Sequence, residues 1–106
     1  MIRHICMFSL KEENKTANAA EFLRRGEELG RHPTIRGAQV VGKTQGAPNA
    51  NYDVALIFDF DSLEELNAYQ VSPEHVAFGQ FVGEIRLDRA CIDYEVRQAF
   101  PLTNAH

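Results

Sequence analysis

The sequence has no tryptophan, only two cysteines, and no apolar run near the roughly 20 residues that cross a bilayer. Its first ten residues, MIRHICMFSL, lack the long apolar core and the small-residue cleavage site of a signal peptide. We therefore expect a cytoplasmic protein with no membrane partner.

Neither cysteine belongs to a CxxC pair. Cys6 and Cys91 each lie in an apolar, strand-like run, and a free cysteine in such a run is most often a buried thiol. We accordingly predict two reduced, buried thiols, no redox motif, no metal site and no cofactor.

Positive charge is also scarce. The chain has 11 Lys and Arg against 15 Asp and Glu, a net charge of −4, and no basic run. A protein that binds a phosphate backbone normally carries a basic patch, so nucleic acid is not an expected partner.

What is present indicates one globular domain. The 106 residues are 44% hydrophobic and 25% charged, as in ordinary folded domains. We expect this domain to cover residues 1–97 and residues 98–106 to form a C-terminal tail. A domain of this size often gains stability by association.

Alternating patterns predict four strands, at residues 2–10, 35–43, 52–60 and 89–97. The loop sequence TQGAPNAN separates the second and third strands. In the first strand both faces are largely apolar, so both should be covered.

Helical spacing fills the remaining segments. Phe22 and Leu29 fall on one helical face of the segment after residue 10, where Asn18 and Glu21 suggest a capping box. Two shorter helices follow the third strand, capped at Asp61 or Ser62 and at Ser72. Their predicted inward residues are Leu63, Leu66, Tyr69, Val76, Phe78 or Gly79, and Val82.

The predicted order is β-α-β-β-α-α-β, an α+β fold whose four-stranded sheet is mostly antiparallel. Helices gathered on one face leave the other face exposed, and an apolar exposed face requires a cover. The simplest cover is a second copy of the chain. We therefore expect a homodimer through the face that bears Ile5, Met7, Ala55 and Ile57.

The corner AYQVSPEHVAFG, residues 68–79, is the most suggestive local motif. Ser72 and Pro73 are typical of a helix start, so Tyr69 ends one helix while His75 begins the next. Either side chain has a purely structural interpretation, as a packed ring or a solvated histidine. Together they also suggest the mouth of a pocket.

The sequences MIRHICMFSLK, YDVALIFDFDSLEELNAYQVSPEHV and DYEV resemble the stress-responsive dimeric A/B-barrel (Dabb) family, from Met1 to about Val96. This resemblance implies a ferredoxin-like chain that pairs into a dimeric α+β barrel. The family includes olivetolic acid cyclase-like proteins, which are cofactor-free polyketide cyclases.

The resemblance also implies a site. Tyr69 and His75 match the functional tyrosine and histidine of those cyclases, whereas Gly26 and Arg89 depart from their pocket, so polyketide substrates are not implied. Some members bind a cation on backbone carbonyls, near residues 29–35 here. The matched pocket-lining positions are His4, Cys6, Phe8, Phe22, Leu56 and Phe78.

Three functions remain open. The first is a cofactor-free enzyme in which His75 removes a proton beside a carbonyl while Tyr69 donates a hydrogen bond to the enolate oxygen. The second is a non-catalytic stress-related or ligand-binding homodimer. The third is a monooxygenase of the wider dimeric α+β-barrel superfamily. For His75, the helix N-terminus and a wall such as Phe78 predict a lowered pKa.

Overall fold

The computed structural model describes residues 1–97, and the predicted tail at 98–106 lies outside them. Within the described part, no helix has both the length and the apolar character needed to cross a membrane. The elements are β1 (Ile2–Leu10), α1 (Lys15–Leu29), β2 (Gly37–Gly42), β3 (Val54–Phe60), α2 (Leu63–Gln70), α3 (Pro73–Ile85) and β4 (Arg86–Glu95).

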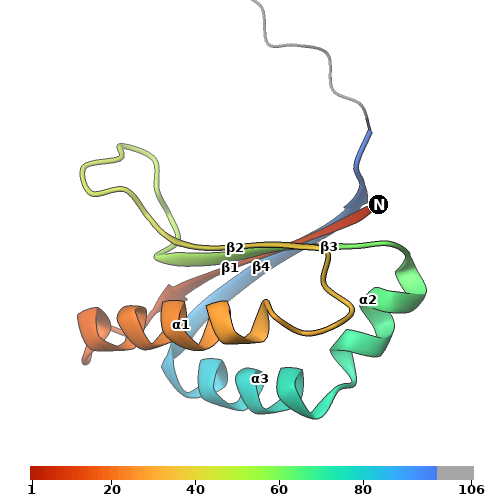
Figure 1. Ribbon diagram of the computed structural model, residues 1–106. Helices are drawn as coiled ribbons and strands as arrows, with labels where there is room; N and C mark the ends of the chain where they lie inside the picture. The colour runs from red at the N-terminus through yellow and green to blue at the C-terminus, as the bar shows by residue number, and fades with distance from the viewer. Residues whose placement is uncertain (98–106) are drawn as a thin grey trace, which may run out of the picture.

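The strands form one sheet in the order β2-β3-β1-β4, and every pair is antiparallel. All three helices lie on the same side of the sheet, as Figure 1 shows. The predicted element order and layer arrangement are confirmed. We call the helix-covered side the inner face and the opposite side the outer face.

The inner face carries the core because alternate residues of β1 and β3 point toward the helices. Leu10, Phe58 and Phe60 are completely buried there. Phe22 of α1 packs its ring between those of Phe8 and Phe78, with ring centroids 5.5 and 5.3 Å apart. These contacts hold α1 and α3 on the sheet as one core.

The helix α1 begins differently from the prediction. Its N-cap is Asn14, in the left-handed region at φ 56°, and no side chain caps the helix there. Asn18 lies inside α1 and donates a hydrogen bond from its side chain to the Glu13 carbonyl at 3.5 Å, so the predicted capping box is wrong.

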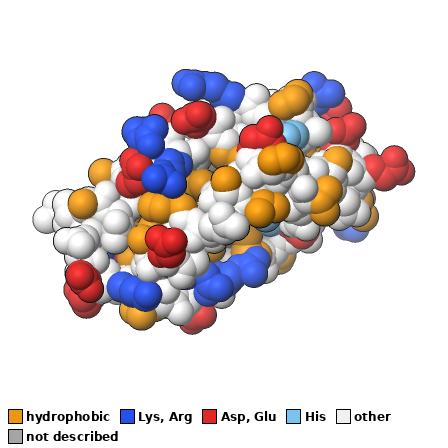
Figure 2. Space-filling view, turned by 90° about the horizontal axis from the view of Figure 1, so that it is seen from below, with side chains coloured by type: hydrophobic (Ala, Val, Ile, Leu, Met, Phe, Trp, Pro, Cys, Tyr) orange, Lys and Arg blue, Asp and Glu red, His pale blue; other side chains and the backbone are white. Residues whose placement is uncertain are grey.

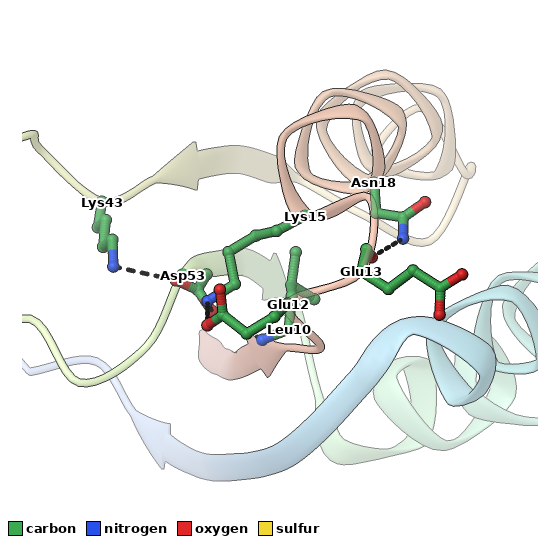
Figure 3. A network of polar contacts seen from close by, with 7 residues as sticks. All are labelled: Leu10, Glu12, Glu13, Lys15, Asn18, Lys43 and Asp53. Atoms are coloured by element: carbon green, nitrogen blue, oxygen red, sulfur yellow. Dashed lines mark hydrogen bonds and ion pairs between the residues drawn. The ribbon is translucent and has the colours of Figure 1, made fainter.

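Asp53 ties the start of α1 to the sheet (Figure 3). Its carboxylate accepts a hydrogen bond from the Leu10 amide at 2.7 Å and lies 3.0 Å from the Lys43 ammonium and 3.6 Å from that of Lys15. Burial opposes ionisation, but this amide and the two ammonium groups hold the pKa of Asp53 below its usual range. Tertiary contacts thus fix a helix start that local capping signals do not mark.

Other boundaries and faces also need correction. The strand β2 is shorter than predicted, and β4 begins directly after α3. The side chains of Leu63 and Val76 are 57% and 49% exposed, so neither is part of the core. The caps at Ser62 and Ser72 are confirmed, since each hydroxyl accepts a backbone N–H of the helix that it precedes.

The prediction of two reduced thiols is wrong. Cys6 and Cys91 form a disulfide, and only Cys6 is buried. The two residues are 85 positions apart in the sequence but directly opposite each other in the β1–β4 pair. Which strands become neighbours depends on the whole sheet, so neither local pattern pointed to this bond.

Candidate functional site

A cavity of about 480 Å³ lies between the inner face and the helices α2 and α3. Viewed from the helix side, the surface mixes hydrophobic side chains with charges of both signs, and histidine atoms are visible among them (Figure 2). The residues that line the cavity are His4, Cys6, Phe8, Leu56, Tyr69, Gln70, Val71, His75, Phe78, Gly79, Val82, Arg86 and Arg89.

The corner between α2 and α3 positions one side of this cavity. The Ser72 hydroxyl donates a hydrogen bond to the Tyr69 carbonyl at 2.6 Å and accepts one from the His75 amide at 3.2 Å. Pro73 occupies the first turn of α3, where its missing N–H costs nothing. A single buried serine therefore fixes the backbone on both sides of the corner.

Tyr69 and His75 meet inside this corner. Their ring centroids are 4.8 Å apart in an edge-on arrangement, and Tyr69 is only 1% exposed. Burial raises the pKa of the Tyr69 phenol, so the phenol stays protonated.

The pKa of His75 shifts the opposite way. Burial lowers it, a hydrogen bond with the Gln70 backbone opposes this, and the nearby His4 and Arg89 lower it further. Burial is the largest of these causes, in line with the desolvation expected from a wall such as Phe78. Both shifts favour the neutral form of the side chain, for Tyr69 and for His75.

Five of the six predicted pocket positions line the cavity. His4, Cys6 and Phe8 come from β1, Leu56 from β3 and Phe78 from α3. The sixth, Phe22, is fully buried behind Phe8 and Phe78 and does not belong to the lining. The family resemblance gave these pocket positions, and the alternation in β1 and β3 agrees with it, since it assigns the sheet residues to one face.

The cavity lining also contains two arginines, Arg86 and Arg89, which the sequence analysis did not predict as a pair. Arg86 begins β4, and Arg89 follows it on the same edge strand. The family resemblance had placed Arg89 at a pocket position, but no sequence signal pointed to Arg86. The return of β4 beside β1 brings both side chains to the cavity.

His32 lies just after the end of α1. Its Nδ1 lies 2.8 Å from the Thr34 hydroxyl, and its ring packs 5.9 Å from that of Tyr69. It supports Tyr69 from outside the cavity, because it is not among the lining residues.

The outer face carries the four residues predicted for a dimer interface. Ile5, Met7, Ala55 and Ile57 are all half-buried, and Ile5 and Ile57 are direct partners across β1 and β3. Three residues of the edge strands that the prediction missed extend the patch, with exposures of 39%, 57% and 39%: Val41, Ile92 and Tyr94.

Within residues 1–97, no three His, Cys, Asp or Glu side chains are grouped so that they could hold a metal ion. The segment 29–35, which the family resemblance connects with a backbone cation site, forms tight turns. In these turns, hydrogen bonds run from the backbone amides of Arg31, His32 and Ile35 to the carbonyls of Glu28, Leu29 and His32, respectively.

The chain matches the model of the stress responsive A/B barrel domain family, Dabb, over residues 2–96. A dimeric protein of ferredoxin-like fold from Bacteroides fragilis is 32% identical, with a TM-score of 0.79 and coverage of 90% of this chain and 95% of that one. No curated protein sequence matches the chain.

Two further structures share the fold at lower identity. A Dabb family protein from Mesorhizobium loti is 21% identical, with a TM-score of 0.77 and coverage of 92% and 97%. The hydroxynitrile lyase of Passiflora edulis is 17% identical, with a TM-score of 0.78 and coverage of 94% and 96%.

Proposed function

Because this chain belongs to the stress-responsive A/B barrel family, we propose that its cavity is the active site of an enzyme that moves a proton on a small carbonyl compound. His75 is the base and Tyr69 the hydrogen-bond donor. The observation that carries this proposal is the direct contact of these two rings within one cavity, 4.8 Å between centroids.

The protonation states suit these roles. A base has to be unprotonated to accept a proton, and burial lowers the pKa of His75. A donor has to keep its proton, and burial raises the pKa of Tyr69. When His75 takes a proton from the carbon beside the carbonyl, the negative charge moves to the carbonyl oxygen, where the Tyr69 hydroxyl stabilises it.

The cavity also favours a particular kind of carbonyl compound. Its apolar walls, such as Leu56, Phe78 and Val82, keep water from the enolate. Arg86 and Arg89 line the same cavity, and guanidinium groups bind carboxylates through paired hydrogen bonds. We therefore expect a 2-oxo acid to be a better substrate than a neutral ketone.

The experiment is exchange of carbon-bound protons in D₂O, followed by proton NMR, with pyruvate and acetone as probes. Wild-type protein should exchange the methyl protons of pyruvate faster than those of acetone. His75→Gln should reduce the rate by about 10²–10⁴-fold, and Tyr69→Phe by about 10²-fold. His32→Gln is the matched control, because His32 contacts Tyr69 from outside the cavity.

Exchange no faster than in buffer, or equal rates for wild type and His75→Gln, contradicts the enzyme. The second candidate, a ligand-binding homodimer, has its own signature in the same samples. Pyruvate would then shift the His75 ring resonances without any exchange of its methyl protons.

We also propose that two copies pair through the outer face. The patch around Ile5 and Ile57 is apolar and has no helix over it, and the 32% identical protein from Bacteroides fragilis is dimeric. Pairing of two such faces removes apolar surface from water and leaves the inner cavity untouched.

Ile57→Lys tests this interface by sedimentation at micromolar concentration. It places a charge in the centre of the patch, which costs several kcal/mol per dimer, on the order of the penalty for an unpaired buried charge. Leu63→Lys is the control, since Leu63 is 57% exposed on α2. Monomeric wild type, or an unchanged dimer in Ile57→Lys, contradicts the interface.

A further inference from the structure

One half of the disulfide, Cys6, lines the cavity together with His4, whereas Cys91 and Asp93 lie beside them on β4 and are not among the lining residues. On the inner face, His4 is opposite Asp93 and Cys6 is opposite Cys91, all in the register of β1 with β4. The Nδ1 of His4 bonds to the Asp93 carboxylate. The Nε2 of His4 lies 3.3 Å from the Cys6 sulfur.

This arrangement orients the histidine toward the sulfur. A carboxylate accepts a hydrogen bond but donates none when ionised, so Nδ1 carries the proton that it shares with Asp93. The lone pair of Nε2 then faces Cys6. The same order of groups, carboxylate to imidazole to sulfur, activates nucleophilic cysteines on unrelated folds.

The two sulfurs have unequal surroundings. Cys6 is 5% exposed and contacts His4, whereas Cys91 is exposed, and the Arg89 guanidinium donates to its sulfur at 3.1 Å. An incoming thiolate can therefore reach Cys91, and Cys6 is the sulfur that has an imidazole nitrogen beside it when the bond breaks. The difference gives the exchange reaction a direction of attack.

We propose that Cys6, Cys91, His4 and Asp93 form a thiol–disulfide exchange centre for small anionic thiols and their disulfides. A cavity of about 480 Å³ admits a small molecule, and Arg86 and Arg89 attract negative charge to it. The centre uses neither His75 nor Tyr69, so it stands independently of the proposed proton transfer.

The reaction is balanced in two steps. A small thiol gives its proton to the free Nε2 of His4 and attacks the Cys91 sulfur as a thiolate, the Cys6–Cys91 bond breaks, and the Cys6 thiolate takes that proton from Nε2. A second small thiolate attacks the sulfur of the first small molecule, which releases Cys91 as a thiolate and a small disulfide. Two thiols are oxidised and one protein disulfide is reduced. In the reverse direction, the dithiol reduces a small disulfide.

The test measures the rate at which the folded protein is reduced, by trapping free thiols with iodoacetamide and counting them by mass spectrometry. The probes are 2-mercaptoethanesulfonate, which is anionic, and cysteamine, which is cationic, at equal thiolate concentration. Wild type should react faster with the anionic thiol, and Arg89→Gln should reduce this preference by about tenfold. Equal rates for the two probes contradict the anionic substrate class.

His4→Gln should slow the reduction by about 100-fold, whereas His32→Gln, whose ring does not contact sulfur, should leave the rate unchanged. If His4→Gln does not fold, Asp93→Asn is the second variant, because the Asp93 side chain is 40% exposed on an edge strand. Asp93 is a positioning residue, so Asp93→Asn should slow exchange and Asp93→Glu should restore most of the rate.

A purely structural disulfide predicts other results. The rate would then be the same in wild type, His4→Gln and Asp93→Asn, or reduction would occur only as fast as the protein unfolds in a parallel denaturation experiment. Either result overturns the exchange centre.

Discussion

The two sides of the inner face differ in how closely the helices approach. Over β2, α1 lies so near that a Cβ built on Gly26 would be 2.8 Å from a methyl of Val40, and one on Gly30 would be 2.9 Å from the Cβ of Ala38. Over β4, the inner face carries Arg89, Cys91 and Asp93, all exposed, and Arg86 and Arg89 of this strand line the cavity.

The difference follows from side-chain chemistry. Small residues let two backbones approach and leave no space between them. Long or charged side chains cannot be covered by an apolar helix without partners for their polar groups. The β2 side is therefore closely packed, and the β4 side retains the polar groups of the proposed exchange centre and the arginines proposed to bind a carboxylate.

The largest test of this comparison removes one aromatic ring from each side. Phe58 is completely buried, and its ring centroid lies 5.9 Å from that of Tyr69. We expect Phe58→Ala to cost about 3–5 kcal/mol of unfolding free energy. Phe78→Ala should cost less, because one side of the Phe78 ring already faces the cavity. Urea denaturation measures both, and equal losses would show that the two sides are packed alike.

Replacing two glycines by alanine should have the next largest effects on stability, and these effects should be opposite in sign. Alanine favours a helix by about 1 kcal/mol over glycine, and a Cβ on Gly83 of α3 meets nothing within 4 Å, so Gly83→Ala should stabilise the protein. Gly26→Ala drives a methyl against Val40, and overpacking costs about 1–3 kcal/mol, so this variant should be less stable than wild type. A gain in melting temperature for both variants would mean that α1 is not closely held on β2.

The smallest effect is a pH dependence on the cavity side. The pKa of His75 is lower in the folded protein than its ordinary value of about 6.5, so the unfolded chain binds the proton more readily. As the pH falls from about 6.5 toward the folded-state pKa, the unfolding free energy should therefore decrease. The decrease should be weaker in His75→Gln, as measured by urea denaturation at a series of pH values. An identical slope in the two proteins rules out a lowered pKa at His75.

The strand faces and the corner of the candidate site followed from local rules, whereas the pocket positions were implied by the family resemblance. The alternation of β1 and β3 assigned His4, Phe8 and Leu56 to one face, since successive side chains of a strand point to opposite sides. Ser72 and Pro73 marked the corner because the free amides at a helix start require a cap. The uncovered apolar outer face could also be predicted, because the helices can cover only one face of the sheet.

What the sequence by itself determined is therefore the set of elements, their faces and the corner that joins Tyr69 to His75. Only the tertiary structure decided that β4 returns beside β1 in a register that places Cys91 on Cys6 and Asp93 on His4. A shift of one residue would turn these side chains to the other face. The register of strands so distant in the chain is set by packing across the whole sheet, and no local pattern records it.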